Sequence, residues 1–363
     1  MSAKMFRLPL SDFAPFLLLT VTVVLALSLV SGPVRAAEDE PLSAAATRNQ
    51  DQVVTDESGQ RFLVLTAGPR ELHVCSSEDS ACDFRTIANA VKAAETGDII
   101  RIAPGVYEEA AVLSAHSVTI LAERGAHMRN VAAENKAALV IKGDNITIKG
   151  LECSGIRVPD RNGACIRLEG KNLTLQDVYF HDSESGILGG GGRLLIEDSR
   201  FERLGADTGQ SHGLYVWGDE VIIRNSWFLS GKQQGHEIKS GAARTVIEES
   251  LLASLDGQDS RLLDAMKGGE VIIRNSILEM GPKSANHEMI GVGYEGISHK
   301  VNSALIEGNT IIIDRPGGVL YGGPVSAQIR NNVIIGGEQI DKNEWFPDRE
   351  SAGIPPYPLL PLE

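Results

Sequence analysis

The chain has 363 residues, enough for one large domain or two ordinary ones. It carries 34 Lys and Arg against 48 Asp and Glu, a formal net charge of −14, which argues against nucleic acid or an anionic membrane surface as a general partner. A polyanionic substrate would need a local cluster of Lys, Arg and His on an otherwise acidic surface.

The first 36 residues have the layout of a secretory signal peptide. Lys4 and Arg7 give a positive start, residues 16–30 form an uncharged apolar run, and Val34 and Ala36 then place small side chains at the two positions that a signal peptidase reads. The alternative is an uncleaved membrane anchor. Because the apolar run is short for a spanning helix and a cleavage site follows it, we expect a cleaved protein. The mature chain would then be periplasmic or extracellular, with no stable membrane span.

Residues 37–70 are polar and lack a clear period, so we interpret them as a linker. Cys75 and Cys82 then flank a short polar loop, and export permits disulfides, so we predict that these two pair. Cys153 and Cys165 flank a second loop and are either another disulfide or two small buried thiols. No Cys-x-x-Cys or His-Cys spacing indicates a zinc site.

Residues 84–95 (FRTIANAVKAAE) place apolar side chains at helical spacing and predict a helix. Residues 96–109 (TGDIIRIAPGVYEE) follow as a turn, a strand, a Pro-Gly turn and a second strand. We expect the helix to cap the first coil of a stack, where bare sheet edges would otherwise be exposed.

One short pattern recurs eight times between residues 146 and 336: an alternating strand, a polar corner and a second strand. A third strand precedes each corner. Asn225, Asn275, Asn309 and Asn332 lie at corners, and we interpret them as structural because Asn tolerates tight bends. The central aliphatic residues of the copies should stack as one buried ladder: Ile148, Leu175, Ile196, Ile223, Ile247, Ile273, Ile306 and Ile329.

Three short strands in each repeat of variable length indicate an all-β solenoid, since a single coil cannot bury its own apolar face. The leucine-rich repeat is the main structural rival, but its Leu-x-x-Leu-x-Leu frame is absent. The helix followed by IIRIAPGVY resembles the opening of right-handed parallel β-helix proteins of the pectate lyase-like superfamily. The resemblance covers about residues 71–337 and implies a right-handed parallel β-helix with an N-terminal capping helix. Residues 338–363 would form a Pro-rich tail over the C-terminal end.

Counting back from the repeats aligns two coils without gaps. His212 then stacks on His236, and Tyr215 on Lys239. By the period-two rule Tyr215, Lys239 and Glu237 should point outward. The sequence therefore predicts one polar patch on a strand face.

Asp264 lies on the next coil, where the count is less regular. The count points its side chain inward, but a changed turn at residues 267–269 would point it outward. An outward Asp264 would complete a site or hold a cation such as Ca²⁺.

The residue types in this patch are those that chemistry on uronate polymers needs. Both β-elimination and C5-epimerisation begin by removing the proton alpha to a carboxylate, which requires a base and a group that stabilises the enolate-like charge. We therefore predict Lys239, Tyr215, His236 and His212 as catalytic residues.

The segments HGLYV, GHEIKSGA and GVGYEG resemble a group of exported bacterial β-helix proteins without a settled activity. This resemblance adds Ser240 and Tyr294 to Glu237 and Asp264 as substrate-binding candidates. Gly241 stands where that resemblance would lead us to expect Arg.

The leading hypothesis is an exported lyase or epimerase acting on an acidic polysaccharide. One alternative is a non-catalytic glycan-binding or surface protein. Another is a glycoside hydrolase that uses Glu237 with Asp259 or Asp264. Low aromatic content, 5% of the chain, slightly disfavours a binder that depends on stacking.

Overall fold

The computed structural model describes residues 52–55, 61–64, 68–76, 82–206 and 209–361. The predicted signal peptide and most of the predicted linker lie outside these residues. The chain divides into two units, and residues 71–361 form one of them. In the other unit, strands β1 (Gln52–Thr55) and β2 (Arg61–Val64) pair antiparallel. Within the part of the chain described, no helix is long and apolar enough to cross a membrane.

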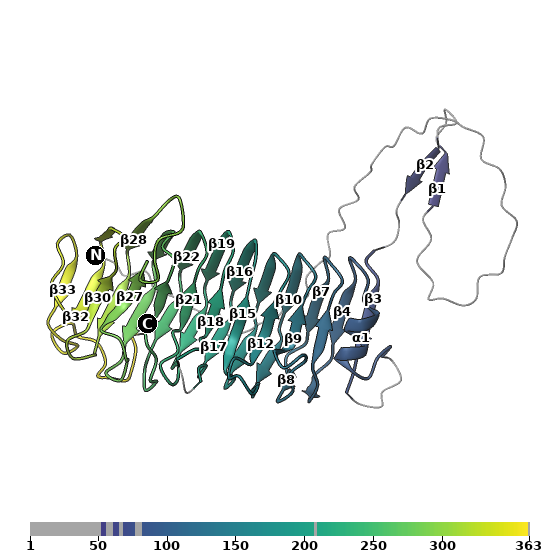
Figure 1. Cartoon of the computed structure of the whole chain (residues 1–363), viewed down its shortest axis with the longest axis horizontal. Coiled ribbons are helices and arrows are strands. Elements are labelled where there is room, and N and C mark those ends of the chain that lie inside the picture. The colour runs from purple at the N-terminus through teal and green to yellow at the C-terminus, as the bar shows by residue number, and fades with distance from the viewer. Residues whose placement is uncertain (1–51, 56–60, 65–67, 77–81, 207–208, 362–363) are drawn as a thin grey trace, which may run out of the picture. The chain divides into compact units, whose positions relative to one another are not determined.

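Three parallel sheets make up residues 71–361, and each sheet takes every third strand along most of the chain (Figure 1). The first sheet contains β3 Glu71–Val74, β4 Ile99–Ile102, β7 Thr119–Ala122, β10 Ile146–Lys149, β13 Leu173–Gln176, β16 Arg193–Glu197, β19 Glu220–Arg224, β22 Arg244–Glu248, β25 Glu270–Arg274, β28 Ser303–Glu307 and β31 Ala327–Arg330. The second sheet contains β5 Gly105–Tyr107, β8 Ala126–Arg129, β11 Glu152–Ser154, β14 Tyr179–His181, β17 Arg200–Glu202, β20 Trp227–Leu229, β23 Leu251–Ala253, β26 Ile277–Met280, β29 Thr310–Ile313, β32 Val333–Gly336 and β33 Glu344–Phe346. The third sheet contains β6 Ala111–Leu113, β9 Ala137–Ile141, β12 Ala164–Leu168, β15 Ser185–Gly189, β18 Leu214–Val216, β21 Ile238–Ser240, β24 Leu263–Ala265, β27 Glu288–Val292 and β30 Val319–Gly322.

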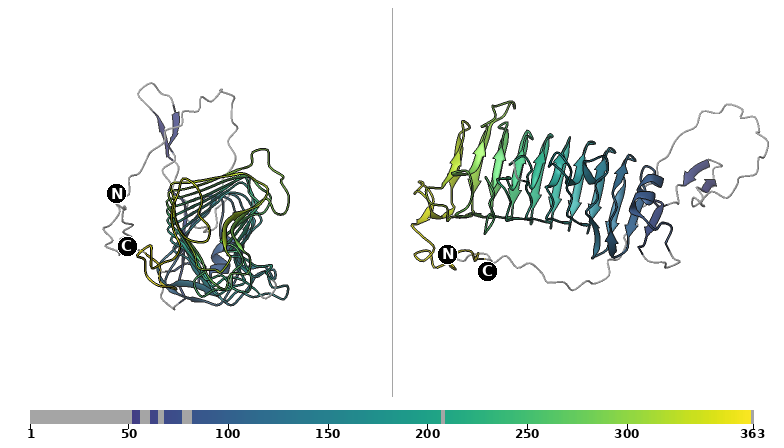
Figure 2. Two further views of the ribbon diagram at one scale, coloured as in Figure 1. Left: turned by 90° about the vertical axis from the view of Figure 1, so that its left-hand side faces the viewer. Right: turned by 60° about the horizontal axis from the view of Figure 1, so that its bottom comes forward.

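This arrangement is the predicted right-handed parallel β-helix. Seen along the stack, successive coils superimpose around one interior (Figure 2, left). The strands are short and most alternate inward apolar with outward polar side chains, as β10 and β13 do, so stacking the coils closes a continuous core.

The predicted aliphatic ladder is confirmed. Its members pair rung by rung through the first sheet, from Ile148 on Leu175 to Ile306 on Ile329. The side chains of the first seven members are fully buried. Ile329 is only partly buried, because β31 is the last strand of its sheet.

Shortening a ladder residue should destabilise the coil stack. We expect Ile223→Val to lower the free energy of unfolding by about 1 kcal/mol, since it removes one buried methyl group between two coils. Denaturant unfolding measures the effect. Arg224→Ala, on the outward side of the same strand, is the control and should stay within about 0.5 kcal/mol. An equal decrease in the free energy of unfolding in the two variants would contradict the idea that the buried ladder stabilises the stack.

The corner asparagines are structural, but in two different ways. Asn225 and Asn275 adopt the left-handed conformation at the bend, with φ of 45° and 51°. Asn309 and Asn332 occupy the next position, where their side-chain oxygens accept the backbone N–H of the preceding coil. Serines do the same on earlier coils and continue the ladder: Ser199, Ser226, Ser250 and Ser276. These bonds satisfy backbone donors that the corner would otherwise leave buried and unpaired.

Helix α1 spans Ile87–Ala93 and is shorter than the predicted 84–95. Thr86 is its N-cap and accepts from Asn89 N–H, while Phe84 bridges to Val74 and so cannot be helical. The helix contacts β3, β4 and β6. Its role as a cap of the first coil stays a prediction.

The structure joins Cys75 to Cys82 and Cys153 to Cys165 by disulfides. In the predicted tail, residues 344–346 add strand β33 to the end of the second sheet. The chain beyond β33 lies against the outer side of that sheet, where the Tyr357 hydroxyl donates to the Leu255 carbonyl oxygen. Arg349 donates two hydrogen bonds to Asp314, and Leu360 packs against the cluster that contains Leu229 and Leu251.

Candidate functional site

Three predicted residues form one rung of the third sheet. Tyr215 on β18 pairs with Lys239 on β21, and Lys239 pairs with Asp264 on β24. Asp264 therefore shares the outward side with Lys239, as the changed turn at residues 267–269 allowed. The register that sequence counting gave for the first two coils is the register in the structure.

Lys239 lies between an aromatic ring and a carboxylate. Its Nζ is 5.0 Å from the centre of the Tyr215 ring and 2.7 Å from Glu295 Oε1. The Lys239 side chain is only 13% exposed, while Glu295, in the loop after β27, is 42% exposed. Glu295 also accepts from Lys267 through its backbone carbonyl, 2.8 Å away. Two lysines thus hold this loop over the rung.

Arg261 is a second cation at the site. Its guanidinium lies 4.6 Å from the centre of the Tyr294 ring, 3.1 Å from Glu288 Oε2 and 3.9 Å from Asp264 Oδ2. The rung continues through Gly291. A Cβ atom there would lie 2.9 Å from Arg261 Cδ, so glycine makes room for the guanidinium stem.

Tyr294 packs over the neighbouring coil in the same way. Gly322 continues the rung beyond Gly291, and a Cβ atom on Gly322 would collide with the Tyr294 hydroxyl. Tyr294 is 45% exposed and so offers one ring face beside Arg261 to solvent.

His212 and His236 stack with ring centres 4.9 Å apart, as the count predicted, but both are buried. Their Nδ1 atoms accept backbone N–H groups, His212 from His236 at 3.0 Å and His236 from Arg261 at 3.1 Å. The hydrogen of each neutral ring is therefore on Nε2. Burial, reinforced by Lys239, lowers the pKa of His212 to about 3, and burial lowers the pKa of His236 well below its usual value.

These contacts favour a positioning role for both histidines over the predicted catalytic one. With Nδ1 bound to the backbone, neither ring has a free nitrogen lone pair to take a proton from a substrate. His236 Nε2 faces Asp264 Oδ2 at 3.4 Å and fixes that carboxylate. Asp264 is itself 3% exposed, and its burial raises the pKa of the carboxyl, although Arg261 and Lys239 oppose the shift.

Glu237 and Ser240 are not on the accessible face. Glu237 was expected outward, but it is 2% exposed and accepts a hydrogen bond from Gly231 N–H. It precedes β21, where the chain is still turning, so strand alternation does not apply. Ser240 is buried and bonds Thr245 and Ala242 N–H. The outward direction predicted for Glu237 is therefore wrong, and substrate binding by Glu237 and Ser240 stays a prediction.

Trp217 belongs to the site but was not predicted. Its ring lies 4.4 Å from that of Tyr215 and is 38% exposed. A Cβ atom on Gly241 would lie 2.7 Å from Trp217 Cδ1 and 2.7 Å from Met266 Cε. Trp217 and Met266 thus fill the space of any side chain at position 241, which explains the glycine where an Arg was expected.

Removing the His236 ring should affect stability first. We expect His236→Ala to lower the free energy of unfolding by about 1–3 kcal/mol, because the buried Arg261 N–H loses its acceptor. His236→Asn, whose amide oxygen can occupy the Nδ1 position, should restore most of this loss. Denaturant unfolding of both variants is the measurement. Unchanged stability in His236→Ala would contradict the positioning role.

The fold has solved counterparts, while comparison by sequence finds none: no protein-family model and no curated protein matches the chain. Pectate lyase Pel9A superposes with a TM-score of 0.54 at 14% identity, over 79% of this chain and 81% of the lyase. Pectin methylesterase PemA from Erwinia chrysanthemi gives 0.45 at 14% identity, over 79% and 95%. Alginate lyase from Paenibacillus sp. str. FPU-7 gives 0.46 at 16% identity, over 77% and 96%. With three parallel sheets and the pectate lyase superposition, this chain has the right-handed parallel β-helix fold of the pectate lyase-like proteins.

Proposed function

We propose that this chain is an exported carbohydrate-active protein that acts on an acidic polysaccharide at the outer side of the third sheet, by β-elimination or C5-epimerisation. The observation that carries the proposal is the grouping of Lys239 and Arg261 with Tyr215 and Asp264 on successive coils. Lys239 and Arg261 are the cations that carboxylates of a uronate polymer would contact there, and in the free protein they pair with Glu295 and Glu288. Export is supported by the two disulfides, which persist in oxidising compartments.

In the proposed reaction a base removes the C5 proton of a uronate. The electron pair moves toward the sugar carboxylate, where Arg261 or Lys239 stabilises the developing charge. In elimination the C4–O bond then breaks, a C4=C5 double bond forms and an acid protonates the leaving oxygen. In epimerisation the proton returns from the opposite face. Tyr215 and Lys239, whose groups are close enough to reach one ring, would share the base and acid roles.

Glu295 is the group that a substrate must displace. Its carboxylate pairs with Lys239 Nζ at 2.7 Å and lies in a partly exposed loop, so a uronate carboxylate can take its place at the ammonium. The exchange replaces one carboxylate by another and leaves Lys239 paired throughout.

The test is incubation of the mature protein with a panel of uronate polymers. Rising ultraviolet absorbance from unsaturated sugar ends would support elimination. Deuterium entering C5 from heavy water without chain cleavage would support epimerisation. Binding to a polymer without either change would overturn the enzymatic proposal.

A glycan-binding protein is the second candidate, favoured by the exposed Trp217 and Tyr294 rings that flank the rung. The hydrolase hypothesis is weaker. Glu237 and Asp259 are 2% and 1% exposed, so this carboxylate pair does not reach a polysaccharide on the surface.

A further inference from the structure

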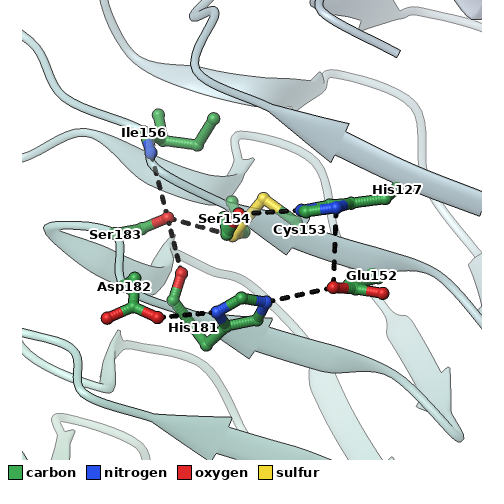
Figure 3. Close-up of a disulfide and its surroundings, with 9 residues drawn as sticks. His127, Glu152, Cys153, Ser154, Ile156, His181, Asp182 and Ser183 are labelled. Carbon is green, nitrogen blue, oxygen red and sulfur yellow. Dashed lines mark hydrogen bonds and ion pairs between the residues drawn. A yellow bond between two sulfur atoms is a disulfide. The ribbon is translucent and has the colours of Figure 1, made fainter. Parts of the chain in front are cut away.

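We propose that His127, Glu152 and His181 form a binding site for one Zn²⁺ ion. The three residues lie on β8, β11 and β14, successive strands of the second sheet, and their side chains converge on its outer face (Figure 3). One ligand atom from each residue lies within 4.8 Å of the other two. This site is independent of the function proposed for the third sheet.

Two imidazole nitrogens face the same carboxylate oxygen. His181 Nε2 lies 3.2 Å from Glu152 Oε1, and His127 Nδ1 lies 3.5 Å from it. Tetrahedral zinc with bonds of about 2.0–2.1 Å separates its ligand atoms by roughly 3.3–3.4 Å. Both distances match those of neighbouring zinc ligands, and the two ring nitrogens, which lie within 4.8 Å of each other, would have to be about 3.3–3.4 Å apart around a bound ion.

A carboxylate orients His181 from behind. Asp182 Oδ2 lies 2.8 Å from His181 Nδ1 and can accept the Nδ1 hydrogen, which is the tautomer that a metal bound at Nε2 requires. Arg203 holds Asp182 in turn, with hydrogen bonds of 3.0 and 2.7 Å. A carboxylate that fixes a histidine by its second nitrogen is the usual support of a zinc ligand.

His127 is oriented in the same manner. Its Nε2 lies 2.7 Å from Ser154 Oγ, and this hydroxyl can accept the Nε2 hydrogen in the tautomer that leaves Nδ1 for a metal. Both rings can therefore present a free lone pair to one point without rotating.

The backbone around the site is held firmly. Cys153, between Glu152 and Ser154, forms the disulfide to Cys165, and the Tyr179 ring stacks on His181 at 4.2 Å. The side chains of His127 and His181 are 16% and 15% exposed, while that of Glu152 is 31% exposed. The ligand atoms are thus sheltered but open to an entering ion.

The donor set selects the metal. Two imidazoles and one carboxylate suit Zn²⁺, whereas Ca²⁺ and Mg²⁺ prefer oxygen ligands. Three protein ligands leave a fourth position for water, the arrangement of zinc sites that are not purely structural.

The experiment is a zinc titration of the full mature chain, untagged and stripped with chelator, followed by calorimetry and thermal unfolding. We expect one Zn²⁺ per chain and a rise in the unfolding temperature. Glu152→Gln should weaken binding at least 10-fold, and Asp182→Asn should weaken it about 10–100-fold. The double variant His127→Gln/His181→Gln should lose the site. Co²⁺ bound in place of Zn²⁺ should give the visible absorption of tetrahedral cobalt.

The matched control is His73→Gln/His116→Gln. Each of these histidines also lies 3.6 Å from one carboxylate, Glu71 or Asp144, but among the described residues neither belongs to a group of three possible ligands. The control should bind zinc like the parent. Absence of zinc binding in the parent, or equal binding in the parent and the folded Glu152→Gln variant, would overturn the proposal and leave the three residues as an ion-pair network only.

Discussion

Replacing Lys239 by alanine is expected to lower turnover of the uronate polymer identified by the panel about 10²–10⁴-fold. Lys239 supplies a cation that contacts both the Tyr215 ring and the exchangeable Glu295 carboxylate. Its loss removes either the proton-transfer group or the charge that stabilises the enolate-like intermediate. Tyr215→Phe, which removes only the hydroxyl, should lower turnover by a similar factor. Steady-state kinetics on the same polymer measures both.

Lys142→Ala is the matched control. Lys142 also pairs with a single glutamate, Glu134, at 2.6 Å, and follows β9 on the same sheet several coils away. We expect its turnover and its unfolding temperature to match those of the parent. If Lys239→Ala retains full turnover, as Lys142→Ala is expected to do, the rung of Tyr215, Lys239 and Asp264 is not the catalytic site.

Raising the pH from 6.5 to 8 is expected to destabilise the fold through buried carboxyls. Glu279 on β26 is fully buried, and its burial, with the nearby Asp314 and Asp259, raises its pKa to about 8 from 4.5. Burial likewise raises the pKa of Glu237 and of Asp259. In this window Glu279 holds a proton in the folded state that the unfolded state has lost, so stability falls as pH rises, by about 1.4 kcal/mol per pH unit below the folded pKa.

The buried histidines do not mask this effect. The pKa of His212 and that of His236 are lowered in the folded state, so their unfavourable contribution to stability grows as pH falls through 6.5, where the unfolded chain binds their protons. As pH rises from 6.5 to 8, the unfolded chain releases the remaining protons, which raises stability by only about 0.4 kcal/mol per histidine. The loss expected from Glu279 over the same window is larger and has the opposite sign.

Glu279→Gln tests the origin of the pH dependence. Gln keeps the acceptor for Leu255 N–H, 2.8 Å from Glu279 Oε2, and cannot ionise. At pH 8 it should raise the free energy of unfolding by up to about 4 kcal/mol, and at pH 5 by little. Denaturant unfolding at the two pH values gives the comparison. The exposed Glu108→Gln is the control, and a decline that persists unchanged in Glu279→Gln would contradict the assignment.

The fold and part of the site followed from the sequence. The aliphatic ladder and the pairing of Tyr215 with Lys239 were readable because parallel coils repeat a local pattern, and equal counts from the pattern give equal heights in the stack. The three strands per coil were readable for the same reason. Residue periodicity reports which side of a strand faces the core, and this is a local property.

The rest was decided by loops and by contacts between coils. Counting failed for Glu237, because it stands in a corner, and could not settle Asp264, because the turn after it changed length. The backbone acceptance by His212 and His236, which favours a positioning role for them, depends on the height of the next coil. The third cluster was missed for the same reason. Glu152 follows His127 by 25 residues and precedes His181 by 29, and because loop lengths set these spacings, no sequence motif predicts the cluster. A period fixes what lies inside and outside, but only the lengths of the loops fix which outward side chains meet.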